Sequence, residues 1–267
     1  MEKIAIISDI HGNISALNAV LEDIKNRNIN KIFCLGDSIV KCTHPDLVID
    51  KLKEVCDVIL LGNCDYVICK PSSKERNFWS RNIIGEERAE FIASLPVSYE
   101  FYMSGHLIRI FHASPYALDE IYNPMYSNKT TNYSHLEIEN PERLFENTDF
   151  IGKTKDDPTP DIVGFGHIHT PFLVRYKNKT MFNPGSVGIP VEMHNRDIND
   201  KNNKFSTMAS YTIIEGIFES KKLDSISFNS VRVPYNIKQE VKDLEDSDMP
   251  NKEIMIRSLT SAIPNNI

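Results

Sequence analysis

Seven residues with metal-ligating side chains occur in five short segments, and each segment closely follows an apolar run. The runs cover residues 4–7, 32–35, 58–61, 107–110 and 162–165. A mixture of carboxylate, amide and imidazole ligands suits divalent metal ions such as Mn²⁺, Fe²⁺ or Zn²⁺. The sequence therefore predicts a metal site built from two carboxylates, one amide and four imidazoles, namely those of Asp9, His11, Asp37, Asn63, His112, His167 and His169.

The apolar runs indicate the strands that must position these side chains. Short continuous apolar runs are typical of strands that are buried on both faces. Helical spacing of apolar residues follows the first two runs, with Asn13 as a capping residue and Pro45 at a first helical position. This strand–helix alternation predicts a parallel sheet with right-handed crossovers. Because ligands bind beyond the carboxyl ends of such strands, we expect all seven side chains at one edge.

Local spacing adds a more detailed expectation. Asp9 and His11 are two residues apart, and so are His167 and His169. In an extended segment, residues two apart point to the same side, so each pair should be presented by an extended segment. A glycine directly before Asp37 permits a tight backbone turn beside an ion.

Two mostly polar stretches interrupt the strand–helix alternation. Residues 66–100 end in a predicted helix over 86–95, and residues 113–160 contain only scattered aliphatic residues. Each stretch could form a lid over the site or a surface excursion that packs on its own scaffold. Farther on, alternating apolar residues predict two half-exposed strands over 209–217 and 225–233.

The chain is expected to form one domain over residues 1–235, with both polar stretches as cap-like excursions. A helical tail over residues 236–267 should pack on the same domain, and Pro250 separates two helical segments in it.

The composition argues against several other classes of protein. Of the 267 residues, 41% are hydrophobic and 25% are charged, which is ordinary for a globular protein. The formal net charge of −7 disfavours a nucleic acid or an anionic membrane surface as a partner, since both call for a basic face. No apolar stretch approaches the roughly 20 residues of a transmembrane helix. Cleavage of a signal peptide would remove the first strand, so we expect a cytoplasmic protein.

Five cysteines lie in about the first quarter of the chain, and none forms a CxxC pair. This distribution argues against a disulfide framework and against a structural zinc ribbon.

The ordered set of motifs resembles the calcineurin-like metallophosphoesterase superfamily, and most of all its small bacterial and archaeal phosphodiesterase-like members. The resemblance spans about residues 3–190 and is carried by Asp9-Ile10-His11, Gly36-Asp37, Gly62-Asn63-Cys64-Asp65, His112 and Gly166-His167-Ile168-His169. It implies an α/β fold in which helices flank a sandwich of two β-sheets, with helical and loop insertions as caps. It also implies a centre for two divalent metal ions, Mn, Fe or Zn, at one sheet edge.

The resemblance implies a division of the ligands as well. One metal ion would be bound by Asp9, His11 and His169. The other would be bound by Asn63, His112 and His167, with Asp37 as the bridge. With a bridging hydroxide, the centre would carry a net charge of about +1 and attract phosphate in spite of the acidic protein. The expected reaction is an in-line attack of that hydroxide on phosphorus.

Further roles follow from the same resemblance. The expected catalytic residues are Asp37, Asn63, His112 and Cys64. The expected substrate contacts are Asn13, Asp65, Gly185 and Ser186. The turn that contains Gly185 could aim backbone N–H groups at a phosphate oxygen, or it could be a tight turn that holds the second sheet in place.

Two departures from relatives narrow the expected function. Cys64 stands where many members carry a histidine that positions substrate or protonates the leaving oxygen; its thiol could donate a proton, or simply pack beside the metals. Segments 36–42 and 61–64 lack both phosphate-clamping arginines of the protein serine/threonine phosphatases, and Leu61 takes one of their positions. Planar bidentate recognition of phosphate is lost with those arginines.

We therefore expect hydrolysis of small-molecule phosphodiesters or of nucleotide pyrophosphate bonds, including those of dinucleoside polyphosphates. The alternatives are a phosphomonoesterase or protein phosphatase of the same superfamily, or a non-catalytic protein-binding scaffold with this fold.

Aromatic and basic residues outside the motifs are candidate substrate contacts. Bases of a nucleotide could stack on Trp79, Tyr116, Tyr122, Tyr126 and Tyr133, although aromatic residues also fill cores and cover loops. Phosphates could be contacted by Lys41, His44, Lys70, Arg76, Arg81 and Lys129.

Overall fold

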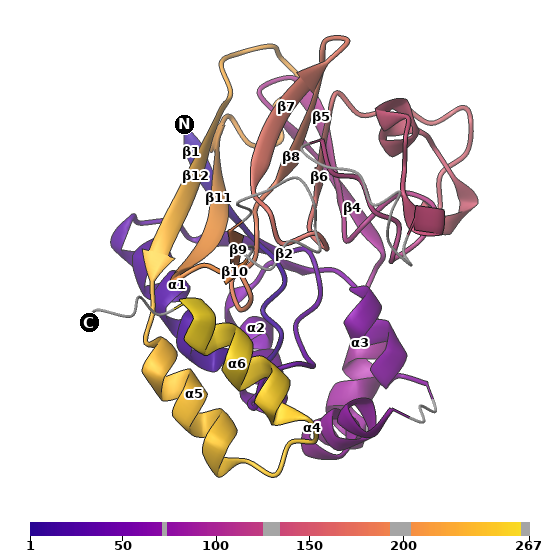
Figure 1. The fold of residues 1–267 in the computed structure, drawn as a ribbon. Helices are drawn as coiled ribbons and strands as arrows, with labels where there is room; N and C mark the ends of the chain where they lie inside the picture. The colour runs from indigo at the N-terminus through magenta and orange to yellow at the C-terminus, as the bar shows by residue number, and fades with distance from the viewer. Residues whose placement is uncertain (71–73, 125–133, 193–203, 263–267) are drawn as a thin grey trace.

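The structure is a computed structural model that describes residues 1–70, 74–124, 134–192 and 204–262. Two five-stranded sheets pack face to face, and helices cover the outer face of the first sheet (Figure 1). The predicted sandwich of two sheets flanked by helices is therefore confirmed. A two-stranded ribbon is formed by β9 (Val191–Glu192) and β10 (Lys204–Phe205).

The first sheet has the strand order β12-β11-β1-β2-β3. Its strands are β1 (Glu2–Ile7), β2 (Lys31–Cys34), β3 (Val58–Ile59), β11 (Met208–Gly216) and β12 (Ser227–Pro234). The strands β1, β2 and β3 run parallel, whereas β11 is antiparallel to both β1 and β12. The two strands predicted late in the chain are confirmed. The expectation that both are half-exposed is wrong for β11, because this strand lies between two others and is covered on both faces.

The second sheet has the strand order β4-β5-β6-β8-β7. Its strands are β4 (Ser98–Met103), β5 (His106–Phe111), β6 (Ile162–Phe165), β7 (Phe172–Tyr176) and β8 (Lys179–Asn183). The strands β5, β6 and β8 are parallel, and the edge strands β4 and β7 are antiparallel to their neighbours. The strand–helix alternation at the start of the chain predicts a parallel sheet, and the parallel pairing of β1, β2 and β3 confirms it. The β4–β5 hairpin then begins the second sheet, which packs on the first.

The burial of β1 explains why its sequence is a continuous apolar run. Ile4 and Ile6 face the second sheet and lie in the core between the two sheets. Ala5 and Ile7 face the other way and pack against α1 (Ile14–Asn26) and α2 (Pro45–Val55). Because both faces of the strand are covered, no position along it favours a polar residue.

The two helices begin where the sequence predicts. The side chain of Asn13 accepts a hydrogen bond of 2.9 Å from the backbone N–H of Ala16 and so caps α1. Pro45 lies in the first turn of α2, where the missing N–H costs nothing.

The stretch over residues 66–100 contains more regular structure than its sequence predicts. Its helices are α3 (Asn63–Ile68) and α4 (Glu75–Ala93), and α4 is interrupted by non-helical backbone at Gly85. The predicted helix over 86–95 corresponds to the second part of α4. Ile68 of α3 and Ile84 of α4 lie in one apolar cluster with Ile49 of α2, and α4 packs on both α2 and α3. The final residues of the stretch belong to β4 and thus to the second sheet.

The described part of residues 113–160 is irregular, as predicted, with three short 3-10 helices over Ser134–Leu136, Pro141–Phe145 and Asp149–Ile151. Leu144 and Phe145 pack on the outer face of the second sheet against Val163 and Phe165. This part of the chain therefore lies against the scaffold.

The C-terminal tail consists of two helices, α5 (Ile237–Asp246) and α6 (Lys252–Ala262), with Pro250 between them as predicted. Leu244, Met249 and Leu259 of the tail form an apolar cluster with Cys42 and Ile189, which lie in loops near the first sheet. Figure 1 shows both helices beside α1 and α2. Among the described residues, no helix combines the length and apolar character that crossing a membrane requires.

Candidate metal centre

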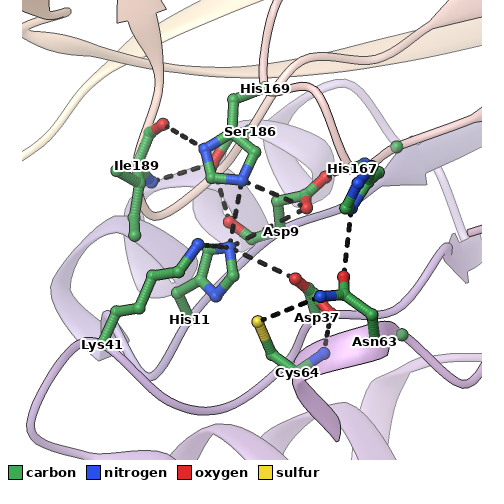
Figure 2. A network of polar contacts seen from close by, with 12 residues as sticks. Asp9, His11, Asp37, Lys41, Asn63, Cys64, His167, His169, Ser186 and Ile189 are labelled. Atoms are coloured by element: carbon green, nitrogen blue, oxygen red, sulfur yellow. Dashed lines mark hydrogen bonds and ion pairs between the residues drawn. The ribbon is translucent and has the colours of Figure 1, made fainter. Parts of the chain in front are cut away.

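The seven predicted ligands meet where the two sheets share an edge (Figure 2). The loops after β1 and β2 and the start of α3 supply four of them: Asp9, His11, Asp37 and Asn63. The ends of β5 and β6 in the second sheet supply the other three: His112, His167 and His169. The five segments do converge on one place, but from two sheets and not from one.

The backbone at most ligands is left-handed. The φ angles are 55° at Asp9, 53° at His11 and 53° at Asp37, and they are 66° at His167 and 61° at His169. The expectation of extended segments is therefore wrong, although each pair does point into the same site. Non-glycine residues seldom adopt this conformation, because it brings Cβ close to the backbone. Its recurrence at five ligands indicates backbone strain that is held in place to aim side chains.

Two glycines give this edge its tight packing. Gly36 has φ 98°, and a Cβ built on it would lie 2.6 Å from the backbone nitrogen of Gly62. A Cβ on Gly62 would lie 2.2 Å from Oδ1 of Asp37. Any side chain at either position would therefore push apart the loops that carry Asp37 and Asn63.

The first group of ligands contains Asp9, His11 and His169, whose ligand atoms lie within 4.8 Å of one another. The Nε2 atoms of the two histidines are 3.1 Å apart, and Oδ1 of Asp9 lies 3.3 Å from Nε2 of His169. Two neutral imidazoles with their protons on Nδ1 cannot form a hydrogen bond through Nε2. Two nitrogens that bind one metal ion at about 2.0–2.1 Å have a comparable separation.

The second group contains Asp37, His112 and His167. Oδ1 of Asn63 lies 3.0 Å from Nε2 of His112 and 3.0 Å from Nδ1 of His167, so the amide oxygen completes this group. Its geometry agrees with the division of ligands that the family resemblance implies.

Asp37 lies between the two groups. Its Oδ2 atom is 3.6 Å from Nε2 of His11, and its Oδ1 atom is 3.4 Å from Nε2 of His112. The backbone N–H of Cys64 donates a 2.8 Å hydrogen bond to Oδ1 and fixes the carboxylate. Asp37 is thus the one ligand whose two oxygens face different groups.

Backbone carbonyl groups orient three of the imidazoles. Nδ1 of His112 donates to Leu35 O at 2.9 Å, and Nδ1 of His169 donates to Ile189 O at 2.9 Å. Nδ1 of His11 lies 3.4 Å from a third carbonyl oxygen, that of Ile39. Because a carbonyl can only accept, Nδ1 carries a proton in these contacts, and Nε2 is the ring nitrogen that faces the site.

The two carboxylates are ionised. Burial raises the pKa of Asp37, but the neighbouring His112 and His11 lower it more, to about 2. Burial opposes ionisation of Asp9 too, yet His169 and the other histidines bring its pKa well below the ordinary value. A site with two buried anionic side chains has a strong electrostatic demand for cations.

The imidazoles of His11 and His167 are neutral. Burial lowers the pKa of His167 to about 4. Burial also lowers the pKa of His11 far below its ordinary value, and the ammonium group of Lys41 adds to this effect. Neutral imidazole is the form that binds metal ions.

One buried atom shows that the protein alone does not complete the site. Oδ1 of Asp9 is buried and has no hydrogen-bond partner among the described residues. Nε2 of His169, at 3.3 Å, is the neighbouring ligand atom. A buried carboxylate oxygen without a donor is costly, and a metal ion would satisfy it. The residues present therefore fit a pair of divalent metal ions.

Cys64 lies beside this centre but is a neutral thiol. Burial and the Asp37 carboxylate raise the pKa of its thiol well above the ordinary value. Its sulfur lies 3.8 Å from Nδ2 of Asn63. The backbone N–H of Cys64 donates to Asp37 Oδ1 at 2.8 Å, and its sulfur lies within 4.8 Å of ligand atoms of His11 and Asp37.

The four predicted substrate contacts have protein partners. Asn13 caps α1 and donates to Gly188 O at 2.9 Å. The Asp65 carboxylate accepts from the backbone N–H groups of Ser38 and Gly62. The hydroxyl of Ser186 donates to Asp9 O at 2.7 Å and accepts from the N–H of Ile189 at 2.8 Å. The N–H of Gly185 donates to Oδ1 of Asn183 at 2.8 Å. These contacts hold the ligand loops, so we infer a positioning role for all four residues.

The predicted stacking residues are also engaged within the protein. The indole N–H of Trp79 donates to Asp248 at 2.7 Å. The guanidinium group of Arg143 lies over the ring of Tyr116, and Tyr122 packs edge-on against Phe165. Tyr126 and Tyr133 lie outside the described residues, as does Lys129.

Sequence reasoning did not single out the carbonyl groups of Leu35, Ile39 and Ile189, since backbone atoms give no residue-type signal. It also did not place Lys41, whose Nζ atom lies 3.1 Å from Nε2 of His11 (Figure 2).

Comparison with known proteins agrees with this geometry. The fold is an α/β sandwich of two sheets whose shared edge presents two adjoining groups of candidate metal ligands. Residues 2–199 match the calcineurin-like phosphoesterase superfamily domain. The chain therefore belongs to the calcineurin-like phosphoesterase superfamily.

Individual relatives cover nearly the whole chain. The uncharacterized protein MJ0912 of Methanocaldococcus jannaschii is 30% identical over 92% of this chain and 93% of its own length. The crystal structure of a metallophosphoesterase from Sphaerobacter thermophilus has a TM-score of 0.65 at 20% identity, covering 98% of this chain and 99% of that one. The hypothetical protein PH1004 from Pyrococcus horikoshii has a TM-score of 0.66 at 18% identity, with coverages of 96% and 97%. These two structures share the fold.

Proposed function

We propose that this protein hydrolyses small-molecule phosphodiesters or nucleotide pyrophosphate bonds with the help of two divalent metal ions. The observation that carries the proposal is the position of Asp37, whose two carboxylate oxygens face two adjoining groups of ligands. A single structural ion would need only one of these groups. When bound, a pair of metal ions supplies an activated water molecule and stabilises charge on the attacking and leaving oxygens.

The protein's own residues prepare the site for that chemistry. Asp9 and Asp37 supply negative charge, and the neutral imidazoles of His11 and His167 add lone pairs without adding charge. The carbonyl groups behind three imidazoles keep their rings in one orientation, so little reorganisation accompanies metal binding. Nitrogen and oxygen ligands together suit Mn, Fe or Zn.

The preference for diesters and pyrophosphates rests on what surrounds the ligands. Leu61 is buried, and its backbone N–H donates to Pro96 O, so no arginine side chain enters the site from this position. Cys64 offers a neutral thiol with a raised pKa and no imidazolium to protonate a poor leaving group. A phosphoanhydride or an activated diester has a leaving group that needs less assistance of this kind.

A non-catalytic scaffold is the proposal's main rival. Within the described residues, side chains fill all seven ligand positions, neighbouring ligand atoms lie between 3.0 and 3.6 Å apart, and Asp9 Oδ1 has no hydrogen-bond partner. A protein-binding scaffold has no need for such an incomplete buried site. A cytoplasmic location, and the absence of membrane and nucleic-acid partners, stay predictions from the sequence.

A hydrolysis screen with the Mn²⁺-loaded protein tests the proposal. The substrates are diadenosine tetraphosphate, bis-p-nitrophenyl phosphate, a cyclic nucleotide and p-nitrophenyl phosphate. We expect turnover of the first two at least tenfold above that of the monoester, and loss of all turnover in His112→Ala. Activity confined to the monoester would contradict the substrate class, and a wild-type protein inactive on all four would contradict the function itself.

A further inference from the structure

A cleft beside the metal centre is lined by basic side chains. Its volume is about 420 Å³, which lies within the range of small-molecule sites. The lining contains three cationic residues, Lys41, Lys74 and Arg76, and one acidic residue, Glu75. The formal charge of this lining is therefore 3 − 1 = +2, in a chain with a net charge of −7. The cleft is therefore suited to an anion.

Lys41 connects this cleft with the metal centre. Its Nζ atom lies 3.1 Å from Nε2 of His11, and Figure 2 shows the side chain reaching over that ring. A metal ion and an ammonium group cannot share the same nitrogen, since both are cations. With a metal ion on His11, the flexible Lys41 side chain must move, and the cleft that it lines is the adjoining space.

Strained backbone holds Lys41 in this place. Val40 and Lys41 have φ angles of 68° and 85°, and a β-branched residue is rarely found in this region. Val40 is buried in the apolar cluster with Ile39 and Ile49, and the N–H of Cys42 donates to His11 O at 2.8 Å. The packing on both sides enforces a conformation that the sequence does not favour, which is typical of functional segments.

The other side of the cleft comes from α4 and from the tail. Nη2 of Arg76 donates to Asn251 O at 3.1 Å, while its Nε is buried without a hydrogen-bond partner among the described residues. Asn251 and Ile254 of the tail line the same cleft. The tail lies outside residues 2–199, which match the superfamily domain, so residues beyond that domain complete the cleft.

The other basic residues considered as phosphate contacts point elsewhere. Lys70 lies over the ring of Tyr66, and Arg81 pairs with Glu86. His44 faces Asp243 of α5 at 3.3 Å. Among the members of that set that the structure describes, Lys41 and Arg76 line the cleft.

We propose that this cleft binds the part of the substrate that carries further negative charge, next to the phosphorus that is attacked. The ligand is an oligophosphate: one phosphate at the metal centre and the next one among Lys41, Lys74 and Arg76. The inference rests on the proposed function and deepens it, because a diester with a single phosphate has no group for this cleft. The bond that breaks is then a phosphoanhydride, water supplies the new P–O bond, and the leaving phosphate departs towards the cleft.

Binding of non-hydrolysable diphosphonates tests the cleft without catalysis. Isothermal titration of the Mn²⁺-loaded protein compares methylenediphosphonate with methylphosphonate, which has a single anionic group. We expect Lys74→Ala to weaken binding of the diphosphonate by about tenfold, the size of one charged hydrogen bond. Binding of methylphosphonate should change less than twofold. The matched control is Lys70→Ala, which removes a lysine close to α4 but outside the cleft.

Kinetics supply the second arm of the test. In Lys74→Ala we expect kcat/KM for diadenosine tetraphosphate to fall by about tenfold, while kcat/KM for bis-p-nitrophenyl phosphate stays within twofold of the wild-type value. For diadenosine tetraphosphate, Arg76→Lys, which keeps the charge, should lower kcat/KM less than Arg76→Gln does. Equal losses on both substrates, or no loss of diphosphonate binding, would overturn the assignment of the cleft. If the wild-type protein hydrolyses neither substrate but still prefers the diphosphonate, the proposed function fails and the anion site stands.

Discussion

Two buried charged clusters in this protein differ in one respect, and the difference separates structure from function. In the second sheet, the fully buried Arg109 donates to Glu100, to Glu146 O and to Asn147, at distances of 2.7, 2.7 and 2.6 Å. All three guanidinium nitrogens have partners supplied by the protein. At the metal centre, by contrast, Asp9 Oδ1 has no donor and two imidazole nitrogens face each other at 3.1 Å.

The partners of a buried charged group therefore indicate whether the group stabilises the fold or awaits a ligand. A charge that the protein neutralises completely contributes to the fold, and nothing further is required of it. A charge that is aimed by strained backbone and left without a partner is arranged for something that the protein does not supply. Arg109 belongs to the first kind, and the group around Asp9 belongs to the second.

The largest effect is expected from the residue that joins the two groups of ligands. Asp37→Ala should lower kcat/KM for bis-p-nitrophenyl phosphate by at least about 10³-fold, because neither group keeps its shared carboxylate. The measurement is Mn²⁺-dependent hydrolysis, with circular dichroism to show that the fold is intact. If Asp37→Ala kept a turnover within tenfold of the wild-type value, the cluster around Asp37 would not be functionally different from the cluster around Arg109.

A substitution in the cluster around Arg109 should lower the stability of the protein and leave metal binding unchanged. Arg109→Met leaves Glu100 with Lys153 as its remaining cationic partner, and we expect a loss of about 3 kcal/mol in the free energy of unfolding. Urea denaturation measures this loss. Arg175→Met, on the exposed part of β7, is the matched control and should change stability by less than about 0.5 kcal/mol. A loss of bound metal in folded Arg109→Met would mean that the two clusters are not independent.

Removal of the metal ions should destabilise the wild-type protein. Chelation leaves the carboxylates of Asp9 and Asp37 buried together without cations, and we expect Tm to fall by about 10 °C. Thermal unfolding with and without a chelator measures the shift, and added Mn²⁺ should reverse it. In Asp37→Ala the shift should be much smaller. An identical Tm in both conditions would contradict metal binding to the folded state.

A smaller effect is expected at Glu240 of α5, which is a buried carboxyl group outside both clusters. Burial, aided by Asp243, raises the pKa of Glu240 to about 8. The folded state therefore keeps a proton that the unfolded state loses above its ordinary pKa of 4.5, so stability should decline as pH rises from about 4.5 to about 8. Glu240→Gln should remove this decline and stabilise the protein at pH 9 by about 2 kcal/mol. Urea denaturation of the wild type and of Glu240→Gln at pH 5 and pH 9 measures this difference in stability. If the stability of both proteins changed equally with pH, Glu240 would not be protonated in the folded state.

The sequence identified the ligands because their chemistry depends on side-chain type. Asp9, His11, Asp37 and Asn63 each follow a buried strand of the first sheet, and apolar runs of this kind are readable without a structure. The helix starts at Asn13 and Pro45 were predictable for the same reason, since caps and first turns select particular residues.

Other features could not be read from residue types. The left-handed backbone at Asp9 and His11 is imposed by the surrounding packing, and the residue types alone do not predict it. The carbonyl of Leu35 orients His112 whatever its own side chain is. The strand β4 alternates weakly between exposed and buried residues, so the hairpin that starts the second sheet was missed. Pairing between β11 and its neighbours decides its burial, and such pairing is a long-range property.

The central claim is that this chain completes its buried site with two metal ions. Equilibrium dialysis against Mn²⁺, followed by elemental analysis, counts them directly. We predict two ions per chain for the wild type and for Arg109→Met, and at most one for His112→Ala. No bound metal in the wild type, or the same count in His112→Ala as in the wild type, would contradict the account.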